Sequence, residues 1–271
     1  MNKHSIYLKG MSLALALGMV MTESVSAAVV INNGSQDLST SSSTLLAQRR
    51  SRLGFRVGVR PSRQRTGGIA RGPSVISDCN GESVTVTALL PQTNRQNQSV
   101  PDDKIEVEQT VSANPTVLVH ITPTKAKNAE FTVLNETGED IVHNEIVSLT
   151  HNSGVVSLKV TDKPLQAGQL YHWAFQISCG GTDGGDLMVD GWLQYNAPTG
   201  ELANVEKQPE KDRPAIYAEK KIWTETVSSL AELRQRYPND PEVAEDWQSL
   251  LESVGLGNIA QAQLIGSLPR E

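Results

Sequence analysis

The stretch that decides the fold is Tyr171-His172-Trp173-Ala174-Phe175-Gln176-Ile177-Ser178-Cys179. Its large apolar side chains occupy every second position, and smaller or polar side chains fill the positions between them. Because successive side chains of an extended strand point to opposite faces, this period of two gathers Trp173, Phe175 and Ile177 on one face. The stretch therefore predicts a β-strand with one face in a core and the other face outside it.

The residues around this strand predict the architecture. Leu165-x-x-Gly168-x-x-Tyr171 has the spacing of the tyrosine corner of immunoglobulin-like folds, where the tyrosine hydroxyl bonds back to the preceding corner. Six other strand-like runs are separated by turn residues, namely Ser83–Leu90, Thr116–Ile121, Glu130–Leu134, Asp140–Leu149, Val155–Thr161 and Leu187–Tyr195. Together they predict an immunoglobulin-like antiparallel β-sandwich over residues 75–197. A jelly-roll-like sandwich is the competing arrangement.

The carboxyl-terminal third changes its apolar period to that of a helix. Apolar side chains recur at spacings of four and three in two stripes, Trp223, Val227, Leu230, Leu233 and then Val243, Trp247, Leu250, Leu251, Val254. Between them, Asp240 is placed as an N-cap and Pro241 as the first helical residue. We predict an α+β fold class with a helical hairpin over residues 211–256 and a tail over 257–271. The hairpin resembles one tetratricopeptide unit, which either packs on the sandwich or binds a partner.

The first residues have the pattern of an export signal. Lys3 and Lys9 precede an apolar run from Met11 to Met21, and the small residues Val25-Ser26-Ala27 follow it. Because crossing a bilayer takes roughly 20 apolar residues, this shorter run favours a cleaved signal peptide over residues 1–27 rather than an anchor. We therefore expect an exported protein, periplasmic or extracellular, with no transmembrane span in its mature chain.

Charge is segregated along the rest of the chain. Eight arginines and no acid lie between residues 49 and 71: Arg49, Arg50, Arg52, Arg56, Arg60, Arg63, Arg65 and Arg71. Residues 72–271 hold 14 basic and 28 acidic residues, a difference of −14. The arginines and the Ser- and Asn-rich stretch before them predict a disordered linker over residues 28–74. This linker is expected to be a solvated tether, to lie against the acidic body, or to contact an anionic envelope surface. Its lack of interleaved aromatics disfavours nucleic acid.

Sequence motifs of enzymes and metal sites are missing. The chain has no G-x-S-x-G, S-x-x-K, H-E-x-x-H, P-loop or Cys-x-x-Cys pattern, so we predict no catalytic residue, cofactor or metal. The mature histidines lack metal-ligand spacing and are interpreted as surface or sheet-face residues: His120, His143, His151 and His172. Asp183 and Asp186 lie in a Gly-rich loop that could hold calcium, although a flexible connector is the favoured interpretation.

The cysteine count predicts a disulfide. Cys179 falls on the apolar face of its strand, and Cys79 lies just before the first strand. Because export places the chain where thiols oxidise, we expect these two cysteines to be bonded to each other. Two buried free thiols and an intermolecular bridge are the alternatives.

Several blocks of sequence together resemble a known family. They are Thr66-Gly67-Gly68-Ile69-Ala70-Arg71-Gly72, Thr87-Ala88-Leu89-Leu90-Pro91, Ala129-Glu130-Phe131, Tyr171-His172-Trp173, Gly191-Trp192 and Ala215-Ile216-Tyr217-Ala218-Glu219. In this order they resemble the domain of unknown function 928 family of exported cyanobacterial proteins, over roughly residues 66–259. The resemblance implies an envelope protein without an assigned activity, so it transfers no functional residue.

These observations predict an exported, non-enzymatic binding or scaffolding module. Its expected partner is an envelope protein or an anionic envelope polymer or lipid. A hydrolase of envelope polysaccharide with an unrecognised carboxylate site is the alternative. A cleft lined by two carboxylates, one with a raised pKa, would favour the hydrolase, whereas a groove without such a pair would favour binding.

Overall fold

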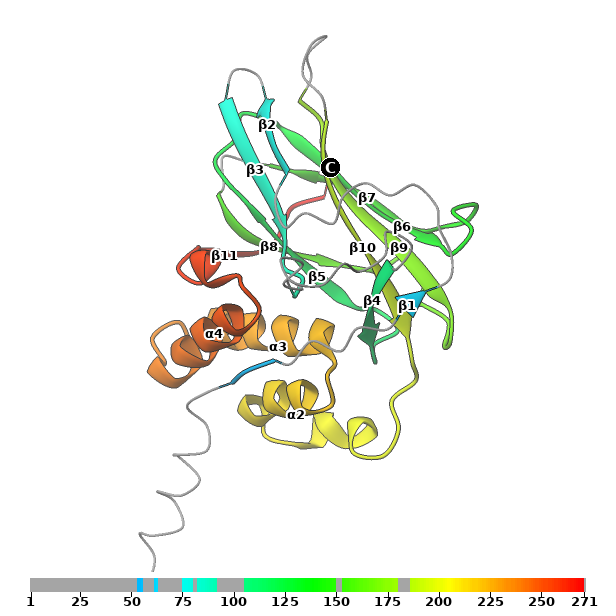
Figure 1. Cartoon of the computed structure of the whole chain (residues 1–271), viewed down its shortest axis with the longest axis vertical. Coiled ribbons are helices and arrows are strands. Elements are labelled where there is room, and N and C mark those ends of the chain that lie inside the picture. The colour runs from blue at the N-terminus through cyan, green and yellow to red at the C-terminus, as the bar shows by residue number, and fades with distance from the viewer. Residues whose placement is uncertain are drawn as a thin grey trace, which may run out of the picture. The chain divides into compact units, whose positions relative to one another are not determined.

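Two β-sheets and a set of carboxyl-terminal helices make up the described part of the chain (Figure 1). The structure, a computed structural model, describes residues 53–55, 61–62, 75–79, 82–91, 105–149, 153–179 and 186–270. One sheet has the order β1 (Pro61–Ser62), β4 (Ile105–Thr110), β10 (Leu187–Tyr195), β9 (Leu170–Ile177), β6 (Asn128–Asn135) and β7 (Ile141–Ser148). The other has the order β11 (Leu264–Ser267), β8 (Gly154–Lys159), β5 (Thr116–Ile121), β3 (Glu82–Ala88) and β2 (Val75–Cys79).

The two sheets face each other across a common core. Val86 and Val119 of the five-stranded sheet are buried in one cluster with Phe131, Trp173 and Phe175 of the six-stranded sheet. Neighbouring strands in the described ranges are antiparallel except for β10 with β4 and β11 with β8, which are parallel. The predicted β-sandwich is therefore confirmed. No helix in these ranges is long and apolar enough to cross a membrane.

Strand β9 and the corner before it follow the predicted pattern. Tyr171, Trp173, Phe175 and Ile177 are buried, and the residues between them are partly exposed. The Gln166 N–H donates to the Tyr171 hydroxyl over 2.8 Å, which is the backward hydrogen bond of a tyrosine corner. The predicted bond is thus confirmed.

Three α-helices follow β10 in the described ranges, and the last of them begins where the sequence predicts. They are α2 (Arg213–Glu219), α3 (Trp223–Arg236) and α4 (Pro241–Ser253), with three short 3-10 helices, η1 (Leu202–Lys207), η2 (Glu210–Asp212) and η3 (Gly257–Ile259). The Asp240 carboxylate accepts hydrogen bonds from the N–H groups of Glu242 and Val243, and Pro241 opens α4. This confirms the predicted N-cap, which satisfies donors that a helix leaves unpaired at its start.

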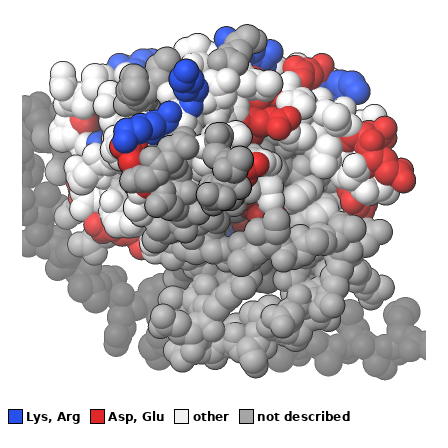
Figure 2. Space-filling model, turned by 90° about the horizontal axis from the view of Figure 1, so that it is seen from above, with Lys and Arg blue, Asp and Glu red and all other residues white. Residues whose placement is uncertain are grey.

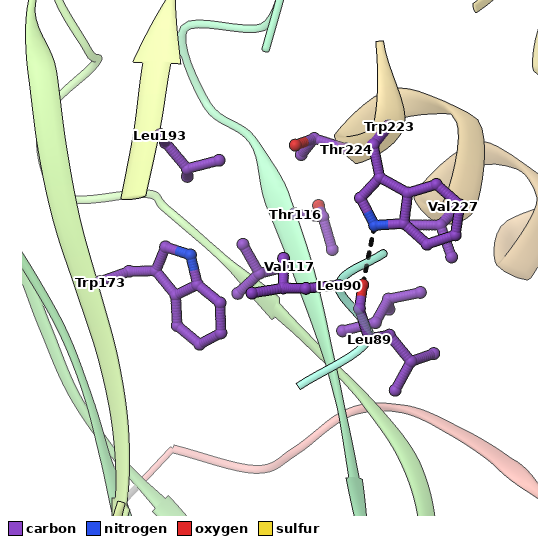
Figure 3. Close-up of a pocket in the computed structure, with 10 residues that line it drawn as sticks. Leu89, Leu90, Thr116, Val117, Trp173, Leu193, Trp223, Thr224 and Val227 are labelled. Atoms are coloured by element: carbon purple, nitrogen blue, oxygen red, sulfur yellow. Dashed lines mark hydrogen bonds between the residues drawn. The ribbon is translucent and has the colours of Figure 1, made fainter. Parts of the chain in front are cut away.

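Helix α3 joins the helices to the five-stranded sheet. Its Trp223 is buried, and the indole N–H donates to the Leu89 carbonyl over 2.8 Å (Figure 3). Leu118 of β5 and Val155 of β8 belong to the same buried cluster as the apolar stripes of α3 and α4. The cavity between Trp223 and Trp173 measures about 10 Å³, at the lower limit for one water molecule. The junction is therefore closed by packing and leaves no room for a ligand.

The structure contains strands that the sequence pattern does not predict. Strands β1, β2, β4 and β11 are added to the seven expected runs. Strand β1 has two residues, and β11 is interrupted by a register shift, so neither shows a clear period of two. The prediction of a tail over residues 257–271 is wrong, because η3 and β11 fall within it and β11 completes the edge of a sheet.

The predicted linker also contains ordered stretches, which are residues 53–55 and strand β1, paired with β4. Phe55 is 6% exposed, its ring meets the Trp223 ring at 4.9 Å with the planes 70° apart, and its N–H donates to Ser253 Oγ over 3.0 Å. The prediction of disorder is therefore wrong for residues 53–55 and 61–62. Burial of Phe55 against α3 stabilises the first of these stretches by more than the conformational entropy that ordering it costs.

Candidate functional site

Most of the residues singled out in the sequence fall outside the description. All eight arginines between residues 49 and 71 lie outside the described residues, as do His151 and Asp183. Asp186 is described, is exposed, and accepts a hydrogen bond from Gln176 Nε2 over 2.6 Å. In the part of the chain that the structure describes, no group of three or more His, Cys, Asp or Glu residues is arranged to hold a metal ion.

Of the two cysteines predicted to be bonded, one has a described side chain. Cys179 follows β9 and is fully buried in the sandwich core. Cys79 ends β2, but its side chain lies outside the description. No free cysteine occurs among the described residues.

The histidines do not share one environment. His172 Nε2 lies 2.6 Å from Asp190 Oδ2, and its ring stacks on Trp192 on the outer face of β9 and β10. His120 of β5 is partly buried, and the loss of solvent lowers its pKa. Both fit the predicted sheet-face position.

The prediction of a surface or sheet-face histidine is wrong for His143. Its side chain is fully buried beside Phe131, with Nδ1 3.0 Å from Asp162 Oδ2 and Nε2 3.3 Å from Glu145 Oε2. The Arg270 Nε lies 2.7 Å from Glu145 Oε1. The carboxyl-terminal segment thus crosses back over β7 and takes part in a charged cluster that sequence spacing could not reveal.

A groove opens between the end of α3 and the segment that leads into β11. It has a volume of about 390 Å³, within the range of about 300–1,000 Å³ that is typical of small-molecule sites. Its lining, called here the α3–β11 groove, consists of Arg234, Gln235, Pro238, Gln261, Ala262, Gln263, Leu264 and Ile265. None of these residues is a carboxylate, and Gln235, Gln261 and Gln263 are exposed.

Two glycines allow β11 and the segment that leads into it to pack closely, against β8 at Gly154 and against α3 at Gly266. The Val155 N–H donates to the Gln263 carbonyl over 2.7 Å, and a Cβ at Gly154 would lie 2.3 Å from that oxygen. Gly266 has a φ of 83°, and a Cβ there would lie 3.1 Å from Gln235 Nε2. Larger residues at these positions would push the segment away from β8 or from α3.

Arg234 is the charged residue of the groove, and no described neighbour balances its charge. The other three arginines in the described ranges are paired, Arg213 with Glu206, Arg236 with Glu210 and Arg270 with Glu145. Arg234 takes part in no ion pair among the described residues, and burial lowers the pKa of its guanidinium. A partly buried arginine without a counter-ion indicates a site for an anionic group.

Charge is mixed on another face of the molecule. Where its residues are described, acidic and basic side chains are interspersed among uncharged ones (Figure 2). In this view the described residues form no extended patch of one sign that would attract a charged polymer. The unpaired guanidinium of Arg234 is therefore a more specific indication of a ligand than surface charge is.

A carboxyl with a strongly shifted pKa lies elsewhere. Glu225, in the first turn of α3, is 8% exposed, and its Oε1 accepts hydrogen bonds from the Thr110 hydroxyl over 2.5 Å and from the Ser112 N–H over 3.2 Å. Its Oε2 is buried without a hydrogen-bond partner in the described part of the chain. Burial raises the pKa of Glu225 to about 7. This carboxyl closes the contact between α3 and the end of β4 and lines neither of the two cavities described above.

Nothing in the sequence marks the groove. Arg234 lies off the apolar stripe of its helix, and Gln261 and Gln263 belong to the segment predicted as a tail. These residues are brought together by the parallel pairing of β11 with β8, which is a tertiary contact without a local pattern.

Comparisons with known proteins identify a family. The family model described as Domain of Unknown Function (DUF928) matches residues 66–264, and no curated protein matches. The fn3 domain of human collagen alpha-1(XX) chain is 16% identical, covers 51% of this chain and 96% of its own, and has a TM-score of 0.23. Bifidobacterium dentium β-glucuronidase complexed with coumarin-3-O-glucuronide is 10% identical, covers 67% of this chain and 36% of its own, and has a TM-score of 0.25. Both TM-scores are low, so these two likenesses say nothing about what the chain binds.

Proposed function

Starting from the fact that this chain belongs to the Domain of Unknown Function (DUF928) family, we propose that it is an exported, non-enzymatic binding or scaffolding module of the cell envelope. Its ligand site is the α3–β11 groove, and the ligand carries an anionic group that pairs with Arg234. The unpaired, partly buried guanidinium in a groove of ligand size is the observation that carries this proposal.

The lining of the groove supports binding rather than hydrolysis. Most glycoside hydrolases place two carboxylates on either side of the bond they cleave. The α3–β11 groove is lined by amides, apolar side chains and one arginine, and Glu225, whose pKa is about 7, is packed in an interface. The hydrolase interpretation therefore has no specific observation in its favour.

We also propose that the two sheets form an immunoglobulin-like sandwich and that the helices form a tetratricopeptide-like hairpin packed on it. The tyrosine-corner bond before β9 supports an immunoglobulin-like sandwich. The tetratricopeptide-like stripes of α3 and α4 are buried against the sandwich, which supports a packed hairpin rather than a free partner-binding repeat. The arginines between residues 49 and 71 would supply a second, less specific attraction to anionic material.

The proposal predicts that Arg234→Gln weakens binding to anionic envelope material. Loss of a charge-assisted contact should lower the affinity about tenfold or more, whereas Arg236→Gln, with the same charge change two residues away, should not. Changing the eight arginines between residues 49 and 71 to glutamine should reduce binding further and make it less dependent on salt. These substitutions leave the chain length unchanged, so the contact of Phe55 with Ser253 is kept. Co-sedimentation with isolated cell walls across a salt series measures both effects. Equal binding of Arg234→Gln and Arg236→Gln would exclude the groove as the site.

The exported chain is also proposed to hold a Cys79–Cys179 disulfide. Burial of Cys179 in the sandwich core and the lack of a free cysteine among the described residues support it. Intact mass spectrometry after alkylation in denaturant should find no modified thiol in the exported protein and one in Cys79→Ser. Two alkylated cysteines in the unreduced protein would contradict the bond.

A further inference from the structure

We infer that the anionic ligand of the α3–β11 groove is a uronic-acid-bearing polysaccharide, whose carboxylate pairs with Arg234 and whose hydroxyl groups bond to the glutamine amides. This inference rests on the proposed function and specifies its ligand. It is built from the charge, the hydrogen-bonding groups and the shape of the groove.

The charge in the groove matches one carboxylate at a time. Arg234 is a single guanidinium whose planar fork fits both oxygens of a carboxylate. The chain from residue 72 onward carries a net −14, so a polymer charged at every repeat would be repelled over most of the surface. A polysaccharide in which uronic acids alternate with neutral sugars is repelled less and still offers a carboxylate to Arg234.

The neutral part of the groove matches a sugar ring. Gln235, Gln261 and Gln263 each offer a donor and an acceptor, and sugar hydroxyls also donate and accept. The Gln261 Nε2 donates to Gln248 Oε1 over 3.3 Å, which restrains one of these amides in place. Pro238, Ala262 and Ile265 present apolar surface on which the C–H face of a sugar can pack.

An extended peptide is a poorer fit. A peptide commonly adds as a further strand at an exposed sheet edge, and β11 is an edge strand. A Cβ on Gly266 would lie 3.1 Å from the Gln235 amide, which places α3 against one face of β11. A strand added at the edge would pair with backbone groups and would make no use of the Arg234 guanidinium or the glutamine amides of the groove.

Titration calorimetry of the mature protein tests the ligand class. The probes are oligogalacturonate, its neutral methyl ester, a glycerol phosphate polymer and an oligoglutamate peptide. Oligogalacturonate should bind at least tenfold more tightly than the ester. Arg234→Gln should abolish this preference, Arg234→Lys should keep part of it, and Arg236→Gln should leave it intact. Circular dichroism of each variant establishes that it is folded.

The outcomes separate the ligand class from the proposed function. Equal binding of acid and ester would overturn the carboxylate contact. Tighter binding of the phosphate polymer or the peptide, lost in Arg234→Gln, would overturn the uronate inference and leave the groove as the site. If a probe binds and Arg234→Gln and Arg236→Gln change its affinity equally, both the uronate inference and the groove as the ligand site are overturned. Failure of all four probes to bind would overturn them as well.

Discussion

Trp223→Ala is expected to lower the free energy of unfolding by about 3–5 kcal/mol. The indole of Trp223 is buried between the helices and the five-stranded sheet, packs edge-on against Phe55, and donates its N–H to the Leu89 carbonyl. Alanine would leave a cavity at the junction and a buried carbonyl without its donor. Because α3 and α4 bury their apolar stripes in the same cluster, the helices should lose their order together with this contact.

Two further proteins isolate the cause of this loss. Trp223→Phe keeps a ring but removes the donor, so it should cost less than alanine, about 1–3 kcal/mol. Residues 211–256 expressed alone should show weak, non-cooperative helicity, because the sheet side of their core is missing. Urea unfolding of the variants and thermal circular dichroism of the fragment measure these effects. A sharp thermal transition in the fragment would show that the hairpin folds independently of the sandwich.

Glu225→Gln is expected to stabilise the protein at pH 8 by about 3 kcal/mol and to leave its stability nearly unchanged at pH 4. Burial raises the pKa of Glu225 from 4.5 to about 7, so the folded state binds its proton more tightly than the unfolded state. Below pH 4.5 the Glu225 carboxyl is protonated in both the folded and the unfolded state, and its contribution to the free energy of unfolding is then most favourable. As the pH rises from about 4.5 to 7, the unfolded state ionises first and this stabilisation is lost.

The test compares the free energy of unfolding of Glu225→Gln with that of the wild type at each pH. The contributions of the other titrating groups cancel in this difference. Glutamine keeps an oxygen that can accept from Thr110 and Ser112, while it removes the charge. Glu232→Gln, at an exposed position of the same helix, is the matched control and should show no such difference. Urea denaturation at pH 4, 6 and 8 gives the result. A stability difference between Glu225→Gln and the wild type that is independent of pH would argue against the buried charge.

The sequence predicts those parts of the fold that have a local pattern. The alternation in residues 171–179, the spacing of the tyrosine corner and the Asp240-Pro241 helix start all depend on residues close together in the chain. The periodic stripes likewise predict which side of each helix is buried. The β-sandwich and the presence of helices after it were therefore accessible from the sequence.

The α3–β11 groove could not be predicted from the sequence in this way. Arg234 and Gln263 meet because β11 pairs in parallel with β8, more than 100 residues earlier in the chain, and because Gly154 allows the close approach. Neither residue has a spacing that signals binding, and one lies in a segment predicted as a tail. The burial of His143 is similar. Its partner Asp162 lies beyond β8 in the chain, and Arg270, which pairs with the other partner Glu145, comes from the end of the described chain.

Mapping the bound ligand by NMR tests the central claim that the α3–β11 groove is the ligand site. The protein over residues 28–271, labelled with ¹⁵N, would be titrated with oligogalacturonate, with amide and side-chain resonances followed. The account predicts that the Arg234 guanidinium, the side-chain amides of Gln235, Gln261 and Gln263, and the backbone of residues 261–265 shift together and saturate at one concentration. Shifts confined to the arginines between residues 49 and 71, with the groove resonances unchanged, would contradict it.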